Sequence, residues 1–167
     1  GMLAINRFAV KEAISHLNKG LELVGTLPSS RERDEKELDL HISLGTAWMT
    51  LRGWAAPEVW TSLHPALGLA KAISRRVALM PIYHGLWNNV MTQGRRTESL
   101  EWTNEMLATA EAPGDADLLL VGHRGACVSH FYRGDFNQSR THGESVMAQY
   151  NEEQHRHIVE TPIVDPQ

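Results

Sequence analysis

Small and apolar residues recur along the chain with the period of an amphipathic helix. A set of five positions with intervals of 4, 3, 1 and 3 residues occurs four times, and the last three copies start 40 residues apart. At 3.6 residues per turn, these five positions share one face of a helix. The four copies are Ala13, Leu17, Gly20, Leu21 and Val24; Val59, Leu63, Ala66, Leu67 and Ala70; Ser99, Thr103, Met106, Leu107 and Ala110; and Ser139, Gly143, Val146, Met147 and Tyr150.

A glycine precedes three of the four copies, at Gly53, Gly94 and Gly134. Glycine has no Cβ and therefore suits a residue that leaves a helix with positive φ. Repetition at intervals of this length is typical of helical hairpins stacked into a solenoid. The pattern predicts an all-α fold over residues 5–150, an α–α superhelix of about seven helices.

Helix boundaries follow from the same pattern and from proline and glycine. Ser30 is placed to cap the second helix, and Pro57 suits the first turn of the third. Pro65 lies inside the third helix and predicts a kink or a later helix start. The polar stretch 151–167 is expected to be an extended tail. The predicted helices are 8–27, 31–51, 57–73, 77–93, 96–112, 116–133 and 136–150.

Composition narrows the function classes. The chain has 167 residues, of which 42% are hydrophobic and 22% charged, and a net charge of −4. A negative net charge disfavours binding to nucleic acid or to acidic membranes. No apolar run is long enough to span a bilayer, and the N-terminus lacks the apolar run of a signal peptide. A single cysteine fits a reducing compartment, so we expect a cytoplasmic protein.

Several motifs resemble a known family. The turn Gly134-Asp135-Phe136, followed by the small residue Ser139, is similar to the hairpin turn of tetratricopeptide repeats. Further segments resemble the tetratricopeptide-like region of bacterial ATPase-containing signalling proteins, of the adenylate/guanylate cyclase type and the ATP-dependent transcriptional regulators. These segments are Glu12-Ala13-Ile14-Ser15-His16-Leu17, Glu37-Leu38-Asp39-Leu40, Gly53-Trp54-Ala55-Ala56-Pro57-Glu58-Val59 and Gly85-Leu86-Trp87.

The resemblance implies a superhelix that binds other proteins or other domains of its own chain. We therefore expect a non-enzymatic interaction scaffold without cofactor or metal, a fragment of a larger signalling or regulatory protein. The 40-residue period differs from the usual 34 residues of these repeats. The generic binding site of such a solenoid is the face lined by the first helix of each hairpin. In this chain that face predicts Ser43, Ala47, His84, Asn88, Met91, Arg124, Val128 and Phe131.

An alternative from another class is a small metal- or thiol-dependent enzyme that uses His123, Cys127 and His130. His123 lies four residues before Cys127 and could activate it from the same helix face. Zinc sites on helices usually pair histidines at i and i+4, however, and His123 and His130 are seven residues apart. A cysteine in an apolar run is more often a small core residue.

The first predicted helix carries the stripe of a second hairpin helix, with no first helix before it. Its apolar residues would then face water unless another copy of the chain covers them. We expect an isologous homodimer through Ile5, Phe8, Ile14, Leu17 and Leu21.

Overall fold

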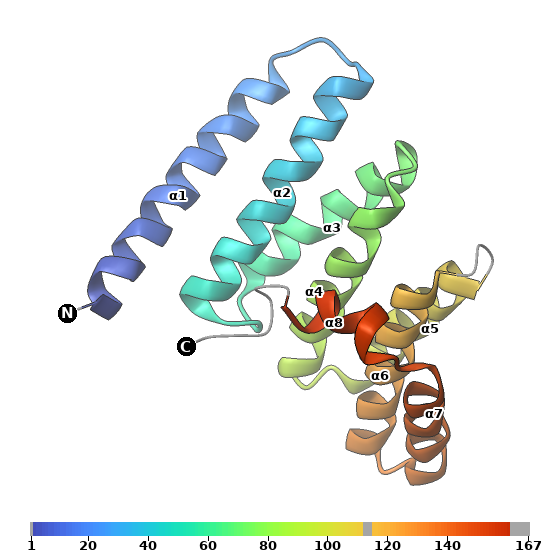
Figure 1. The fold of residues 1–167 in the computed structure, drawn as a ribbon. Coiled ribbons are helices and arrows are strands. Elements are labelled where there is room, and N and C mark those ends of the chain that lie inside the picture. The colour runs from blue at the N-terminus through green and yellow to red at the C-terminus, as the bar shows by residue number, and fades with distance from the viewer. Residues whose placement is uncertain (1, 112–114, 161–167) are drawn as a thin grey trace. The chain divides into compact units, whose positions relative to one another are not determined.

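The computed structural model describes residues 2–111 and 115–160, and the side chains of residues 8–111, 115–155 and 158. Regular secondary structure in these residues is entirely helical, which confirms the predicted all-α class (Figure 1). The elements are α1 (Met2–Gly25), α2 (Arg31–Arg52), α3 (Pro57–Ala72), the short 3₁₀-helix η1 (Arg76–Ala78), α4 (Leu79–Thr92), α5 (Arg96–Glu111), α6 (Ala116–Arg133), α7 (Phe136–Gln149) and α8 (Glu152–Glu160).

Most predicted boundaries agree with these helices to within two residues. Helix α1 is the exception at the N-terminus, because it begins at Met2 rather than at residue 8. At the other end, residues 152–160 form α8, so the expectation of an extended tail is wrong for this stretch, and residues 161–167 lie outside the described residues.

Helix α8 forms because Asn151 caps it. The Asn151 Oδ1 atom accepts from the backbone N–H groups of Glu153 at 3.0 Å and Gln154 at 3.2 Å. In return, His155 Nδ1 accepts from the backbone N–H of Asn151 at 2.9 Å. This reciprocal arrangement satisfies donors that a helix start otherwise leaves without partners.

The chain divides into two compact units, residues 1–89 and residues 90–167. In the first unit, α1 packs against α2 and α2 against α3, as successive antiparallel helices (Figure 1). In the second unit, α5 packs against α6 and α6 against α7. Each unit is therefore built from consecutive helical hairpins, whereas a superhelical arrangement of all helices stays a prediction.

Leu63 of α3 is the tightest packing point of the first unit. A Cβ atom on Gly45 of α2 would lie 2.6 Å from Leu63 Cδ2, and one on Gly85 of α4 would lie 2.3 Å from Leu63 Cδ1. Both distances are shorter than any real carbon contact, so the Leu63 methyl groups occupy the space that other residues fill with Cβ. Leu63 is 2% exposed. Two glycines, 40 residues apart, thus allow α2 and α4 to approach the same leucine.

The apolar stripes of α3 and α5 are buried as predicted. All five stripe positions of α3 are buried, and in α5 only Leu107 of the five keeps partial exposure. A Cβ on Gly122 of α6 would lie 2.9 Å from Leu107 Cδ2, so a glycine faces a leucine in the second unit as well. The stripe of α7 is buried only at Ser139, and Met147 is 83% exposed.

Helix ends from α3 onward share one hydrogen-bonded turn. Asp135 N–H donates to His130 O at 3.0 Å while Gly134 N–H donates to Phe131 O at 3.0 Å, the two bonds of a Schellman motif. The bond from the sixth residue to the first recurs at residues 70, 90, 110 and 130, which are spaced by 20. Gly53, Gly94 and Gly134 have φ of 84°, 76° and 84°, which confirms the predicted positive φ.

Pro65 lies inside α3, which begins at Pro57, so the predicted alternative of a later helix start is wrong. Pro65 and Thr61 are both exposed. The Thr61 carbonyl loses its helical donor at Pro65, and its exposed position leaves it open to water.

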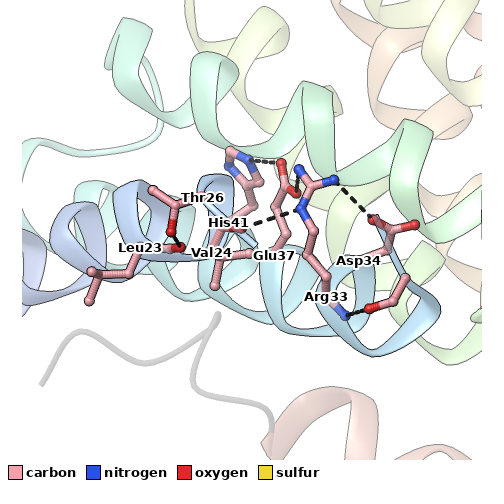
Figure 2. A network of polar contacts seen from close by, with 8 residues as sticks. Leu23, Val24, Thr26, Arg33, Asp34, Glu37 and His41 are labelled. Atoms are coloured by element: carbon pink, nitrogen blue, oxygen red, sulfur yellow. Dashed lines mark hydrogen bonds and ion pairs between the residues drawn. The ribbon is translucent and has the colours of Figure 1, made fainter. Parts of the chain in front are cut away.

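A polar network closes the turn between α1 and α2 (Figure 2). Arg33 Nε donates to the Val24 carbonyl at the end of α1 at 3.3 Å, and Arg33 Nη2 contacts Glu37 Oε2 at 2.9 Å. Ser30 accepts from the Arg33 backbone N–H at 3.1 Å, which confirms the predicted cap. His41 Nε2 lies 4.0 Å from Glu37 Oε1. Burial lowers the pKa of His41, and the Glu37 carboxylate opposes this shift more weakly.

We predict that Gly85→Ala lowers the free energy of unfolding by about 1–3 kcal/mol, because the new methyl group overpacks Leu63 and Gly45 prevents its retreat. Chemical denaturation measures this value. Gly68→Ala is the matched control, since a Cβ there meets no atom within 4 Å, and it should stabilise the helix by about 0.5–1 kcal/mol. In a Leu63→Ala background Gly85→Ala should cost much less; an undiminished cost contradicts the packing argument.

We also predict that Arg33→Met lowers the free energy of unfolding by about 1–2 kcal/mol, because the Val24 carbonyl and the Glu37 carboxylate lose a charged donor. Lys36→Met is the control. The Lys36–Glu32 pair is 57% and 77% exposed, respectively, and its loss should change stability by no more than about 0.5 kcal/mol. Equal effects of the two substitutions in denaturation experiments would show that the network does not hold the hairpin.

Candidate functional site

An open groove lies between α1 and α2 in the first unit. Its volume is about 550 Å³. Its walls are Lys11 and Ile14 of α1 and Trp48, Leu51 and Arg52 of α2. Within each helix these residues are three or four positions apart, so each helix presents them on one face. Apolar side chains and two cations therefore line one groove.

The two cations differ in their surroundings. Arg52 forms an ion pair with Glu58 in the first turn of α3, which holds its guanidinium at the end of the groove. Lys11 is exposed at the α1 side. The wall residue Ile14 is 6% exposed, and Trp48 and Leu51 are half-buried. This arrangement suits a ligand that combines an apolar side chain with a carboxylate.

Two of the predicted binding residues, Ser43 and Ala47, lie on α2 but do not line the groove. Ser43 is exposed and Ala47 half-buried. Helix α4 carries two more, His84 and Asn88, whose side chains meet with 3.0 Å between Asn88 Nδ2 and His84 Nε2. The His84 ring also contacts Trp54 edge-on, with 5.6 Å between centroids. This cluster stays half-buried.

The other four predicted binding residues belong to the second unit. Arg124 and Phe131 are exposed, and Met91 and Val128 are half-buried. Phe131 is 56% exposed and contacts the rings of Tyr132 and Phe136 at 5.6 and 5.8 Å. None of the eight residues is buried, and their use as one continuous binding face stays a prediction.

The residues predicted for self-association do not form one uncovered face. Ile14 is buried, and Leu17 and Leu21 are half-buried where α1 packs on α2. The expectation that Ile14 awaits a second copy is therefore wrong. Phe8 is 69% exposed, because it lies nine residues before Leu17, about two and a half turns, and so points to the opposite side. The side chain of Ile5 lies outside the described residues.

Three histidines meet between α6 and α7. His123 Nδ1 of α6 lies 2.9 Å from His142 Nδ1 of α7. The His130 and His142 rings are stacked with 5.6 Å between centroids and an interplanar angle of 11°. Sequence analysis paired His123 with His130 and missed His142. The signal was present, since His142 follows the inward-facing Ser139 by three residues and thus shares its helix face.

Cys127, the proposed nucleophile of the alternative enzyme, lies between these histidines on α6. Its Sγ atom is 3.6 Å from Ser139 Oγ, and Ser139 Oγ donates to the Cys127 carbonyl at 2.9 Å. The thiol is half-buried rather than sealed in the core. Within the described residues, no group of three or more His, Cys, Asp and Glu side chains is arranged to hold a metal ion.

Comparisons with known proteins do not assign the chain to a family. No protein-family model matches it, and no curated protein or solved structure shows significant similarity to it. None of the described helices is both long and apolar enough to cross a membrane. The resemblance to tetratricopeptide-like regions consequently rests on the sequence motifs alone, and the groove and the histidine cluster are the sites that the structure itself offers.

Proposed function

We propose that the chain is a non-enzymatic helical scaffold that binds an acidic, amphipathic segment of another protein in the groove between α1 and α2. The observation that carries this proposal is the groove itself, which joins apolar walls to two cations. The segment could equally belong to another domain of a longer parent chain. The motif resemblance to tetratricopeptide-like regions of regulatory proteins supports the same class of function.

Charge and apolar character together select the partner. Lys11 supplies a positive charge at the α1 side, and Arg52 another at the end of α2. An acidic side chain at the groove rim would pair with these cations, while a large apolar side chain beside it would displace water from Trp48 and Leu51. Apolar burial contributes about 25 cal/mol per Å² of surface, and the charges add orientation and specificity.

The superhelix belongs to this proposal. Consecutive antiparallel helices within each unit support it, as do the glycine turns and the 20-residue spacing of the helix ends. In such an array the first helices of the hairpins provide further contact residues, among them Ser43, His84 and Phe131.

Selection from a displayed library of short random peptides tests the groove. We expect enrichment of peptides that place Asp or Glu beside Leu, Phe or Trp. Lys11→Glu should raise the Kd of an enriched peptide about tenfold or more, because attraction at the groove rim becomes repulsion. Calorimetry measures the Kd with each variant, and circular dichroism confirms that the variants remain folded.

Lys19→Glu is the matched control for this experiment. It makes the same charge change on the same helix, at a residue that pairs with Glu22 and does not line the groove. Its effect on the Kd should be about twofold or less, since exposed charges act weakly at this distance. An equal loss with both variants would mean general electrostatic attraction, and a library without enrichment would contradict the proposed binding function.

Self-association is a separate prediction, and the structure confines it to the exposed side of α1. Light scattering at tens of micromolar should report a homodimer for the native chain. Phe8→Glu should shift the population to monomer, because it places a charge in the apolar contact. Leu27→Glu serves as the control, since Leu27 is also exposed, at 48%, but lies beyond the end of α1. A native monomer at these concentrations would show that the prediction is wrong.

A further inference from the structure

The three histidines between α6 and α7 form a cluster that the proposed binding function does not use. We name His123, His130 and His142 the histidine joint. His142 makes both contacts across the helix pair, a 2.9 Å approach to His123 Nδ1 and a stacked contact with His130. All three side chains are half-buried, so water screens them only in part.

A distance of 2.9 Å between two Nδ1 atoms constrains their protons. One nitrogen must carry a hydrogen and donate, and the other must be bare and accept. One further proton on the outer nitrogen of the donor ring preserves this hydrogen bond. A second further proton places N–H groups on both facing nitrogens, removes the acceptor and sets two positive charges against each other. The pair therefore titrates in two coupled steps, and only the second breaks the contact.

We propose that the histidine joint is a proton-operated switch, in which protonation of both His123 and His142 releases α7 from α6. The switch depends on α7 being weakly held elsewhere. Of the described α7 residues only Ser139 is buried, and its apolar residue Met147 is 83% exposed. The contact at Gly143 is slight, since a Cβ there would lie 3.5 Å from Cys127 Sγ, an ordinary separation. Loss of one interhelical contact is thus a large part of what holds α7.

Charged groups on every neighbouring element bear on the joint. From α5, the Glu111 carboxylate favours protonated His123. At the α6–α7 turn, Asp135 Oδ2 lies 3.5 Å from His130 Nδ1 and also accepts from Arg133 Nε at 3.2 Å.

Other charged groups lie farther out. On α7 the Arg140–Glu144 pair is more than 70% exposed. Helix α8 meets the first turns of α6 through His155 and Asp117, whose atoms are 3.9 Å apart. Cys127 lies within the joint on α6, and Arg124 is exposed beside His123.

Burial and mutual repulsion outweigh the nearby carboxylates. Burial lowers the pKa of His123 despite Glu111, and burial together with the charges of His123 and His130 lowers the pKa of His142. A histidine with a lowered pKa in the folded state stabilises that state fully above its unfolded pKa, about 6.5, and loses this contribution as the pH falls below it. The joint is therefore closed at neutral pH and opens in the mildly acidic range.

Cys127 provides the readout. It is the single cysteine of the chain and lies in the joint against Ser139 and Gly143. The reagent 4,4′-dithiodipyridine labels thiols in mild acid, and a short unfolded peptide containing the same cysteine corrects for intrinsic reactivity. Relative to that peptide, we expect Cys127 to react about tenfold faster at pH 5 than at pH 7.5, the change that one unit of pKa difference produces.

Substitutions separate the switch from general acid unfolding. In His142→Gln the side chain keeps its hydrogen-bonding capacity but does not titrate, so the acceleration at pH 5 should disappear. His16→Gln, at an exposed histidine of α1, should retain it. The proposal is overturned if His142→Gln opens with the native pH midpoint, or if corrected labelling of the native chain does not change with pH.

Proton NMR of the histidine ring hydrogens supplies a second measurement on the native chain, independent of whether a variant folds. His123 and His142 should each show two titration steps, and the second should accompany loss of the resonances of packed α7. Independent single-step titrations near the ordinary histidine pKa would contradict the coupled pair. Retained α7 resonances after both rings are protonated would contradict the release.

Discussion

The packing of Leu63 between Gly45 and Gly85 is the constraint on which the first unit depends. A helix pair ordinarily keeps its axes 8–10 Å apart because side chains on both surfaces need room. Here one leucine fills the space of two missing Cβ atoms, at distances of 2.6 and 2.3 Å. Helices α2, α3 and α4 must meet at this residue, and their other contacts follow from it. The second unit repeats the device with Leu107 and Gly122.

Turn geometry gives the later helices a common length. From α3 to α6, the same backbone hydrogen bond ends a helix every 20 residues. Each helix therefore offers a similar number of turns to its neighbour, and each buried stripe falls opposite the next. The turn between α1 and α2 differs, since side chains of Ser30 and Arg33 close it instead. The groove opens between these two helices.

Polar contacts between helices are few and therefore informative. The Arg33 network binds one cation to a carbonyl and to carboxylates, so its charges balance and it holds α1 against α2 over a wide pH range. The histidine joint contains three groups of one kind, and its charge depends on pH. The first network is a permanent fastening, whereas the second depends on bound protons. The structure thus places a fixed contact in one unit and a titratable contact in the other.

The sequence by itself determined the local features of this protein. Helix boundaries, the cap at Ser30, the positive φ of Gly134 and the buried stripes of α3 and α5 all depend on residues within a few positions of each other. Such features follow from helical periodicity and from steric limits on the backbone. The tertiary structure decided which residues from different helices meet. It turned Phe8 away from the face that contains Leu17, formed the groove between α1 and α2, and brought His142 to His123. No spacing along the chain encodes these contacts, because they depend on the angle and separation of two helices, which the packing of all their side chains sets together.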